Sequence, residues 1–294
     1  MTDLELSVLV VSWNTRDLLR DCLRSTLESV ESTPAEIIVV DNASADGSAA
    51  MVRREFGDEL RVSLLANDRN EGFARGNNQA YEMSRGEMVL VLNPDVLLSR
   101  AALRGMLEHV RADPAAGIVS CNLVGIDGVP QTLHRAFPTL PIVFSLWTGI
   151  GRLIDRFLLF GLNRRRYHLK GRHPRGAVTI DQAAAACVLL RRSTVECIGG
   201  LFDERFPLFF NDVDLSRRVW DAGLEVRVLY DVSVVHHGGA SIRQLPVRQR
   251  KQEHREALVR YYEIHEPGWK ARLVRLMVGG GQRRGARAGA VAGA

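Results

Sequence analysis

The sequence predicts an α/β protein built around a mainly parallel sheet that is flanked by helices. Three observations support this fold class. Short apolar runs rich in Val, Ile and Leu recur through residues 1–124, as in strands that are buried on both faces. Segments with apolar residues at helical spacing separate these runs, which is the βαβ pattern of a parallel sheet. Polar residues directly follow three of the runs, where the carboxyl ends of parallel strands meet.

Strands and helices are expected to alternate through this first part of the chain. Residues 6–13 ("LSVLVVSW") and 35–41 ("AEIIVVD") are almost continuously apolar, which predicts buried strands. Thr15 precedes apolar residues at helical spacing, so we expect its side chain to cap a helix. The other expected elements are strands at residues 61–67, 87–96 and 117–124, and helices at residues 46–56, 72–84 and 100–111.

The pattern changes after residue 124. Residues 125–180 contain a hairpin-like turn ("GIDGVP"), several prolines and a basic, aromatic insert. Beyond them the sequence predicts strands at 181–192, 224–230 and 232–237, a short helix at 191–200 and an amphipathic helix at 246–264. We expect one α/β domain over residues 1–245, with halves 1–124 and 125–245, then a helical extension over 246–278 and a disordered basic tail over 279–294.

Charge is distributed unevenly along the chain. The 294 residues are 46% hydrophobic and 25% charged, as in ordinary soluble proteins, and the formal net charge is +5. Residues 152–175 hold eight basic residues against Asp155 alone, and residues 267–294 hold six basic residues and no acidic one. Such blocks attract phosphates, anionic lipid head groups or nucleic acid, and the alternative is a solvated basic face with a disordered tail. We expect an anionic membrane surface as a partner and no nucleic acid.

Several classes of protein are not supported. The four cysteines are scattered without a CxxC pair, which favours reduced thiols and suggests no zinc site. The N-terminus is acidic where a signal peptide is basic, and the apolar stretch 136–151 is short and contains Pro138 and Pro141. GxGxxG and Walker A motifs are absent. We expect a cytoplasmic protein, peripheral at the inner face of the plasma membrane.

Three predicted strands end in polar residues that would share one edge of the sheet. The first ends in Ser12, Trp13 and Asn14, the second in "DNAS" from Asp41, and the fourth in "NPD" up to Asp95. In open α/β sheets, ligands bind beyond the carboxyl ends of the strands. Each motif also has a plain structural interpretation as a turn or a helix cap, and the glycines of "NEGFARGNN" would then simply loosen a helix.

Two further motifs contain chemistry-bearing side chains. "FPLFFNDVDLSRRVWDAG" places Asp212 and Asp214 in the first turn of an expected helix after apolar residues. A carboxylate beside so much apolar surface is energetically costly unless it is ion-paired, bound to a metal or solvated. "VVHHGGAS" ends a strand in His236 and His237. The alternatives are that both aspartates only cap the helix and that neither histidine is a ligand.

The order of these motifs resembles family 2 inverting glycosyltransferases of the GT-A fold, and especially the bacterial rhamnosyltransferase-like members that build cell-wall and surface polysaccharides. The resemblance covers roughly residues 6–245 and rests on "DNAS", "NEGFARGNN", "NPD", "FDERF…FFNDVDLSRR" and "VVHHGGAS". It implies a Rossmann-like, mostly parallel sheet flanked by helices. Two positions depart from the family pattern: Asn93-Pro94-Asp95 replaces a DxD motif, and Asn211-Asp212 replaces a Glu-Asp pair.

The resemblance also implies a role for each site residue. Asp212 matches the catalytic base, whose pKa apolar neighbours would raise, and Asp95 with His236 would hold Mg²⁺ or Mn²⁺. His236 is preferred to His237 because the family's histidine precedes the motif serine, Ser241, by five residues. Asp214 and Arg218 would orient the acceptor or each other. The residues expected to bind the donor are Ser12, Trp13, Asn14, Asp41, Asn70, Gly72, Asn77, Asn93 and Asp95.

Asp41 would read a uracil or thymine base, whereas Trp13 would contact the nucleotide or belong to the core. The implied reaction transfers a sugar from a dTDP- or UDP-sugar, with dTDP-rhamnose as the best candidate, to a saccharide acceptor that is lipid-linked. The insert over 137–175 would face the membrane or pair with a partner subunit, as in a homodimer. Two alternatives remain: a nucleotidyltransferase, which would want a glycine-rich basic loop after the first strand, and a non-catalytic protein that binds sugar nucleotides.

Overall fold

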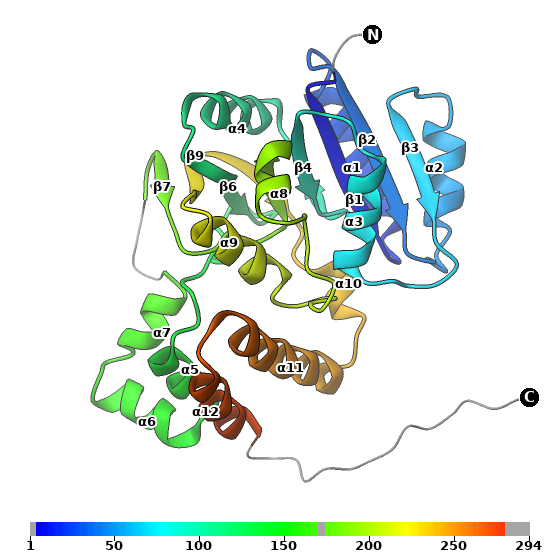
Figure 1. Ribbon diagram of the computed structural model, residues 1–294. Coiled ribbons are helices and arrows are strands. Elements are labelled where there is room, and N and C mark those ends of the chain that lie inside the picture. The colour runs from blue at the N-terminus through cyan, green and yellow to red at the C-terminus, as the bar shows by residue number, and fades with distance from the viewer. Residues whose placement is uncertain (1–3, 170–173, 280–294) are drawn as a thin grey trace, which may run out of the picture. The chain divides into compact units, whose positions relative to one another are not determined.

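The structure, a computed structural model, describes residues 4–169 and 174–279 (Figure 1). The chain divides into two compact units. The first contains Met1–Phe137 and Arg165–Ala257, and the second contains Pro138–Arg164 and Leu258–Ala294. The expected tail from residue 280 onward, and residues 170–173 of the basic block, lie outside the described residues.

The first unit is an α/β structure. Its strands are β1 (Leu6–Ser12), β2 (Ala35–Asp41), β3 (Val62–Ala66), β4 (Met88–Leu92), β5 (Val96–Leu97), β6 (Ala116–Val124), β7 (Ala177–Thr179), β8 (Cys187–Arg191) and β9 (Glu225–His236). Its helices are α1 (Arg16–Ser29), α2 (Ser48–Phe56), α3 (Phe73–Met83), α4 (Arg100–Ala112), α8 (Arg192–Cys197), α9 (Asn211–Asp221) and α10 (Ala240–Arg243). The alternation predicted for residues 6–124 is confirmed.

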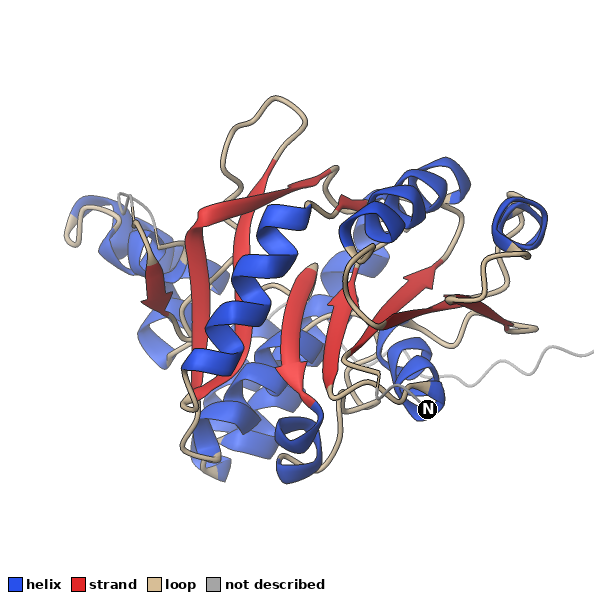
Figure 2. Cartoon of the chain, turned by 90° about the horizontal axis from the view of Figure 1, so that it is seen from above, coloured by secondary structure: helices blue, strands red, loops and turns tan. Residues whose placement is uncertain are grey.

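The nine strands of the described residues form one sheet in the order β3-β2-β1-β4-β8-β6-β9-β5, with β7 also on β9. The β1–β2, β2–β3, β1–β4 and β6–β9 pairs are parallel, and β8 runs antiparallel to both β4 and β6. Because β8 is antiparallel to both β4 and β6, these two strands run parallel to each other. β1, β2, β3, β4, β6 and β9 therefore all point the same way. The mainly parallel sheet is therefore confirmed, and Figure 2 shows it with helices packed against it.

Helices cover both faces of the sheet, which explains the continuous apolar runs. Leu6, Val8 and Val10 of β1 pack in one buried cluster with α1, α2 and α4. Leu9 and Val11, which point the other way, pack in a second cluster with α3, α8 and α9. A strand buried on both faces has no polar side to alternate with, so periodicity 2 is absent from its sequence.

Two expected strands are in fact one. Residues 224–230 and 232–237 form the single strand β9, whose register against β6 jumps from Leu229–Cys121 to Ser233–Asn122. The polar residues that suggested a break in the sequence therefore form a bulge within one strand. Residues 181–186, also expected as strand, precede β8 instead.

The second unit is helical, and its helices within residues 138–164 were not predicted. It contains α5 (Leu140–Trp147), α6 (Gly149–Phe157), the start of α7 (Leu162–Tyr167), the end of α11 (Val247–His265) and α12 (Gly268–Gly279). Pro141, which suggested a break, lies in the first turn of α5, where its missing N–H removes no helical hydrogen bond. α11 and α12 match the expected C-terminal helices. No helix among the described residues is long and apolar enough to cross a membrane.

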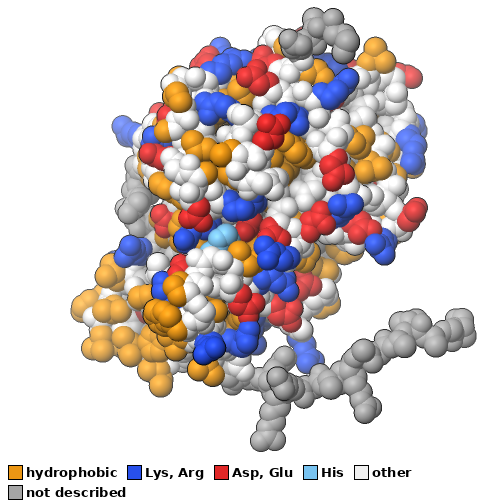
Figure 3. All heavy atoms as spheres, in the orientation of Figure 1, with side chains coloured by type: hydrophobic (Ala, Val, Ile, Leu, Met, Phe, Trp, Pro, Cys, Tyr) orange, Lys and Arg blue, Asp and Glu red, His pale blue; other side chains and the backbone are white. Residues whose placement is uncertain are grey.

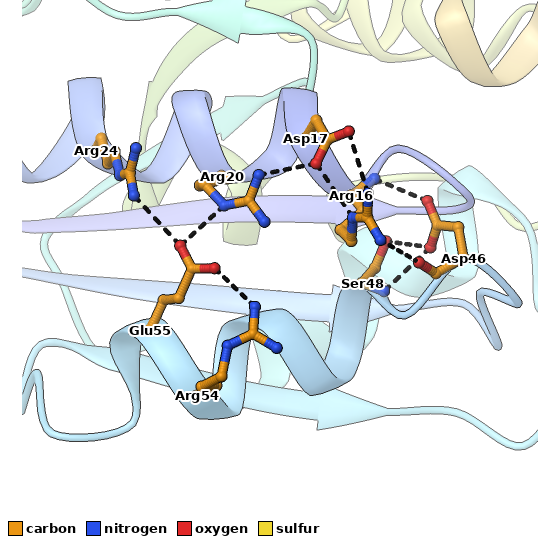
Figure 4. A network of polar contacts seen from close by, with 8 residues as sticks. All are labelled: Arg16, Asp17, Arg20, Arg24, Asp46, Ser48, Arg54 and Glu55. Carbon is orange, nitrogen blue, oxygen red and sulfur yellow. Dashed lines mark hydrogen bonds and ion pairs between the residues drawn. The ribbon is translucent and has the colours of Figure 1, made fainter.

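A polar network joins the start of α1 to α2 (Figure 4). Asp46 accepts hydrogen bonds from the Arg16 backbone N–H at 2.8 Å and from the Ser48 backbone N–H at 3.0 Å, so one carboxylate binds both helix starts. Thr15 occupies the N-cap position of α1, but its side chain accepts no helix N–H and contacts the Ser12 hydroxyl instead, so the predicted cap is wrong. The exposed Arg20–Glu55 pair adds little stability, whereas Asp46 positions the loop after β2.

Gly86→Ala should destabilise the protein by about 3 kcal/mol, because a Cβ would lie 2.5 Å from the backbone nitrogen of Ser7 and 2.6 Å from the carbonyl carbon of Leu6. Backbone atoms of a central strand cannot move aside. Urea unfolding checks this, with Gly149→Ala as the matched control, because a Cβ at Gly149 meets nothing within 4 Å. Equal stability of the two variants would contradict the packing described for β1 and β4.

Candidate active site

The carboxyl ends of β1, β2 and β4 bring the predicted polar loops together. Ser12 is in register with Asp41, and Val10 is in register with Leu92, so the three strands end at one edge. Asn14 ties two of the loops to each other: its side-chain oxygen accepts from the Ala45 N–H at 2.7 Å, and its N–H donates to the Ser44 hydroxyl. Its φ of 51° is left-handed, a conformation that Asn tolerates better than most residues.

Asp41 lies at this edge with one oxygen unused. Its side chain is buried, and Oδ2 accepts from the Ser44 N–H at 3.0 Å. Oδ1 is buried and makes no hydrogen bond within the described part of the chain. Buried polar atoms ordinarily have a hydrogen-bond partner, and a polar ligand would supply the one that Oδ1 lacks.

The loop before α3 and α3 itself supply three of the predicted residues. The Asn70 side chain accepts from the Gly72 N–H at 2.9 Å, and Gly72 has a φ of 87°. A Cβ at Gly72 would lie 3.1 Å from the Pro207 carbonyl oxygen, so this position brings the loop against the segment before α9. Asn77 is buried on α3, donates to the Phe73 carbonyl, and leaves its Oδ1 without a hydrogen bond among the described residues.

Ser12 and Trp13 have less direct access to a ligand. The Ser12 hydroxyl is buried and contacts the Thr15 hydroxyl at 2.9 Å. The backbone oxygen of Trp13 accepts from the Ser241 hydroxyl at 3.2 Å, so the segment after β9 is attached to the end of β1. The Trp13 side chain is partly exposed at this edge.

Asp95 and His236 meet because β5 pairs with β9. Val96 is opposite His236 in this antiparallel pair, and the His237 N–H donates to the Asp95 carbonyl at 2.9 Å. Both side chains, of Asp95 and of His236, are almost fully buried, and Nε2 of His236 lies 3.5 Å from Oδ1 of Asp95. His237, which directly follows β9, is more exposed than His236.

Gln131 determines which nitrogen of His236 has the proton. Its amide nitrogen donates to the His236 carbonyl at 2.7 Å, and its amide oxygen lies 2.7 Å from Nδ1 of the same residue. Because that oxygen can only accept, Nδ1 must have the proton, and the neutral form of the ring would then present its lone pair at Nε2. Nε2, which makes no hydrogen bond among the described residues, faces the Asp95 carboxylate. A hollow of about 280 Å³ lies in this region, and its lining residues are Gly125, Ile126, Asp127, Val129, Pro130, Gln131, His236 and His237.

Asp95 is held in its ionised form. Burial alone would raise the pKa of this carboxyl, but its interaction with His236 and the hydrogen bond from the Ala240 N–H at 3.2 Å outweigh burial and leave the pKa below its ordinary value. Asn93, two residues earlier, donates its N–H to the Ala186 carbonyl at 2.9 Å and leaves its side-chain oxygen buried without a hydrogen bond among the described residues. A carboxylate oxygen of Asp95 thus faces a ring nitrogen of His236, and the amide oxygen of Asn93 lies two positions earlier in the chain than Asp95. These atom types suit a divalent cation.

Asp212 lies in the first turn of α9, as predicted. Its side chain keeps a partial opening to solvent but lies deep among other groups, and this burial raises the pKa of its carboxyl. The Val213 N–H, which donates to Oδ1 at 2.9 Å, and the nearby charge of Arg135 oppose that rise without cancelling it. A carboxylate with a raised pKa accepts a proton more readily than an exposed one.

Arg135 and Tyr167 complete the surroundings of Asp212 and were not predicted. The Arg135 guanidinium lies 5.9 Å from the centre of the Tyr167 ring, and Asp212 acts electrostatically on both. Burial lowers the pKa of Arg135 and raises that of Tyr167. The sequence around Arg135, "QTLHRAF", has no periodic or motif signal, so only the fold brings Gln131 and Arg135 to the site.

Asp214 and Arg218 form a separate structural pair. Nε of Arg218 donates to Oδ2 of Asp214 at 2.8 Å, and Asp214 is 1% exposed. The other guanidinium nitrogens donate to the carbonyls of Ile198, Gly200 and Leu201. The pair thus attaches α9 to the loop after α8, and it orients Asp212 indirectly by fixing the helix.

The sequence is similar to known proteins over most of its length. A family model described as Glycosyl transferase family 2 matches residues 7–198. A curated relative, the N-acetylglucosaminyl-diphospho-decaprenol L-rhamnosyltransferase of Mycobacterium tuberculosis, is 26% identical over 285 residues, which cover 93% of this chain and 89% of the relative. The O-antigen biosynthesis protein RfbC of Myxococcus xanthus is 28% identical over 239 residues, which cover 81% of this chain and 18% of that protein.

A solved structure shares the fold. The mannosyltransferase PcManGT from Pyrobaculum calidifontis, in complex with GDP-Man and Mn²⁺, aligns with a TM-score of 0.56 at 20% identity. The alignment covers 93% of this chain and 69% of that chain. At this identity the likeness concerns the fold, which extends over nearly the whole chain.

Asp212→Asn and Asp214→Asn should change stability in opposite directions. The raised pKa of Asp212 means that its protonated form favours folding, so its contribution is present at low pH and is lost as pH rises through the folded pKa. Asn stays neutral, so Asp212→Asn should become increasingly stabilising, relative to the parent, as pH rises from the ordinary 3.8 to the raised folded pKa, and the difference should stay constant above it. Asp214→Asn should cost about 3 kcal/mol because it breaks a buried ion pair.

Thermal unfolding from acidic to mildly alkaline pH measures both effects, and each variant is the control for the other. A loss of stability in Asp212→Asn at neutral pH would show that its carboxylate is a structural group.

Proposed function

The chain belongs to glycosyl transferase family 2, and from this membership we propose that it is an inverting enzyme that transfers rhamnose from dTDP-rhamnose to a lipid-linked saccharide. The membership confirms the family resemblance, the GT-A fold and the enzyme class that the motifs indicated. Cell-wall or surface polysaccharide would be the product. The identities of the donor, the acceptor, the metal and the catalytic base are part of this proposal.

One observation carries the proposal: a row of buried polar atoms at the carboxyl edge of the sheet has no hydrogen bond within the described part of the chain. The atoms are Oδ1 of Asp41, Oδ1 of Asn77, Oδ1 of Asn93 and Nε2 of His236. Leaving a buried polar atom unsatisfied costs about 1–3 kcal/mol, so a ligand that completes these atoms would recover that free energy. A nucleotide-diphosphate sugar with a cation offers donors and positive charge to complete them.

Asp41 would recognise the base of the donor. The Ser44 N–H holds Oδ2, which leaves Oδ1 to accept the imide N–H of uracil or thymine. Asn14 joins the loops on either side, so this carboxylate is presented by a rigid edge. Asp41 cannot distinguish the two bases, since both have that donor.

Asp95 and His236 would hold the cation that binds the donor diphosphate. Their ligand atoms fit a divalent ion, because a carboxylate oxygen of Asp95 faces an imidazole nitrogen of His236 at 3.5 Å. The nitrogen ligand favours Mn²⁺ over Mg²⁺, and the structural relative was solved with Mn²⁺. Such an ion neutralises the charge that develops on the diphosphate as it leaves.

Asp212 would act as the base. The proton of the acceptor hydroxyl moves to its carboxylate as the hydroxyl oxygen bonds to the anomeric carbon and the bond from that carbon to the diphosphate oxygen breaks. Attack opposite the leaving group inverts the anomeric centre. Burial raises the pKa of Asp212, and the hydrogen bond from the Val213 N–H and the charge of Arg135 oppose that rise.

The sugar and the acceptor are proposed from the relative that matches nearly the whole chain. The Mycobacterium tuberculosis protein is named for transfer of L-rhamnose to a diphospho-decaprenol-linked N-acetylglucosamine. Because that alignment covers 93% of this chain, it includes the segment between β6 and β8 as well as the donor edge. An acceptor of the same kind, a polyprenyl-diphosphate saccharide, is therefore our candidate.

Family membership removes the nucleotidyltransferase alternative. A non-catalytic sugar-nucleotide-binding protein is the competing proposal, motivated by Asn93 and Asn211. Asn211 is buried and donates to the Leu208 carbonyl at 2.9 Å, a structural contact that does not involve Asp212. The replacement thus leaves the proposed base intact.

Thermal-shift measurements with dTDP-rhamnose, UDP-sugars and GDP-mannose, each with and without Mn²⁺, test the donor. We expect dTDP-rhamnose to stabilise most and only with the metal, because a ligand of the folded state raises stability by mass action. Transfer to a polyprenyl-diphosphate N-acetylglucosamine then tests the reaction. Binding without transfer or donor hydrolysis would favour the non-catalytic alternative.

Asp212→Asn should reduce transfer by about 10²–10⁴-fold while donor binding stays unchanged, because the variant keeps the size of the base and loses its proton acceptor. In the parent, kcat/KM should rise with pH through a pKa above the ordinary 3.8. Arg135→Gln should move that rise to higher pH, because the Arg135 charge lowers the pKa of Asp212. An unchanged pH profile in Arg135→Gln would show that Arg135 does not affect the pKa of the catalytic base.

Gln131→Leu should weaken Mn²⁺ binding by about 10–100-fold, because it removes the acceptor that keeps the proton on Nδ1 of His236. Gln131→Glu keeps an acceptor and should retain most of the affinity. Electron paramagnetic resonance of free Mn²⁺ in the presence of dTDP measures this without turnover. His237→Ala is the control and should bind as the parent does, whereas equal affinity of Gln131→Leu and the parent would refute the role of Gln131.

A further inference from the structure

Exposed apolar side chains concentrate on α6 and the turn that follows it. Within residues 150–162 the exposed fractions range from 39% for Leu159 to 78% for Phe160. In Figure 3, orange side chains gather at the lower left, where Figure 1 labels α6. We call this the α6 surface, and its apolar members are Ile150, Leu153, Phe157, Leu158, Leu159, Phe160 and Leu162. Soluble proteins rarely expose so many adjacent apolar groups unless another surface covers them.

The helix separates its inward and outward sides clearly. Gly151 and Asp155 are buried, whereas Ile150, Leu153 and Phe157, at positions i, i+3 and i+7, point outward together. The apolar residues of α6 are therefore not its core face. An amphipathic helix that exposes its apolar side fits an interface rather than a solvated surface.

The turn after α6 is built firmly enough to present its side chains. Asp155 accepts from the Asn163 N–H at 3.0 Å through its carboxylate and from the Gly161 N–H through its carbonyl, and Asn163 donates to the Ser145 hydroxyl at 2.8 Å. Phe160 has a φ of 49°, a conformation that bulky residues rarely adopt, yet its ring is exposed. Burial of the Phe160 ring within this unit thus does not explain its strained backbone.

Positive charge borders the surface without any exposed negative partner nearby in sequence. Arg152, Arg156 and Arg164 are exposed, and the only acidic residue between positions 138 and 164 is the buried Asp155. α12, which packs on α5 as α6 does, also exposes apolar residues beside arginines, and its Arg275 is ion-paired with Glu263. Its exposed apolar residues are Trp269, Leu273 and Leu276, and its exposed arginines are Arg272 and Arg275.

We propose that the α6 surface docks on an anionic lipid bilayer. Its Leu, Ile and Phe side chains enter the boundary between head groups and acyl chains, and its arginines contact lipid phosphates. A symmetric contact with a second copy suits the surface less, because a twofold interface would bring Arg152 and Arg156 against the same basic residues with no carboxylate to meet them. The charge pattern thus favours an anionic surface as the occupant.

The inference rests on the α6 surface alone and does not require the proposed transfer reaction. It adds a location to that reaction, because a polyprenyl-linked acceptor resides in the bilayer on which the protein would dock. Binding to vesicles can be measured without donor, metal or acceptor, so failure of either proposal is visible separately.

Flotation of the full chain with vesicles tests the inference. Vesicles of equal parts phosphatidylglycerol and phosphatidylcholine should carry the protein upward, and pure phosphatidylcholine vesicles should carry less of it. Added salt should weaken binding to the anionic vesicles without abolishing it, since the apolar contribution is insensitive to salt.

Phe157→Ser combined with Phe160→Asn should reduce partition into the anionic vesicles at least about tenfold, because two exposed rings no longer enter the bilayer. Asn is chosen at position 160 because it tolerates the left-handed backbone. Arg152→Gln with Arg156→Gln should remove most of the preference for anionic lipid. Leu60→Ser with Met83→Ser, two exposed apolar positions of the first unit, is the matched control and should bind as the parent does.

Turnover with a water-soluble acceptor analogue should be unchanged in all of these variants. Parent protein that does not float, or a phenylalanine variant that floats as well as the parent, overturns the inference. A parent dimer in light scattering that the phenylalanine variant converts to a monomer, with no vesicle binding by either, would assign the surface to self-association instead.

Discussion

The pairing of the two-residue strand β5 with the end of β9 is the contact on which the candidate site depends. It brings His236 beside Asp95, although these positions lie far apart in the chain. Because β9 also pairs with β6 along most of its length, the position of His236 is determined by the sheet and not by a loop. The hydrogen bonds between Gln131 and His236 then fix the ring and place a proton on Nδ1, so Nε2 is the nitrogen that faces Asp95.

A site built on strand ends can keep polar atoms unsatisfied because the surrounding core is stable without them. Two apolar clusters, one on each face, hold the sheet, and the buried oxygens of Asp41 and Asn93 lie just beyond it. Their desolvation is unfavourable in the free protein, and a ligand with matching donors or charge would recover that free energy. Ligand binding and stability are therefore coupled at this edge of the sheet.

The sequence predicted the parallel half of the fold well because burial on both faces makes β1, β2 and β4 nearly continuous apolar runs. It also predicted that Asp41, Asp95 and Asp212 end or begin elements, since strand ends and helix starts have local signals. It failed where tertiary contacts decide the outcome. Pro141 begins α5 instead of breaking a helix, and the polar residues before Ser233 form a bulge inside β9.

The site residues that the sequence did not indicate, Gln131 and Arg135, lie in a segment whose position depends on distant partners. His134, between them, accepts from the Ala184 N–H through Nδ1 and contacts the Cys121 carbonyl through Nε2, and burial lowers the pKa of His134 to about 4. This neutral, fully buried imidazole attaches the segment to the sheet. No local pattern announces such a contact, because it links residues 50 positions apart in the chain.

Asp212 and Asp214 show how two carboxylates in one helical turn acquire different tasks. α9 begins at Asn211, so the two side chains, two positions apart, point to different sides of the helix. Asp214 meets Arg218 one turn later, and that guanidinium also binds three carbonyls of the preceding loop, so this charge is satisfied by the protein itself. Asp212 has only partial compensation, from the Val213 N–H and the charge of Arg135, and burial raises its pKa. A carboxylate that the fold leaves incompletely satisfied retains its capacity to take a proton from a bound molecule, and its satisfied neighbour holds the helix that presents it.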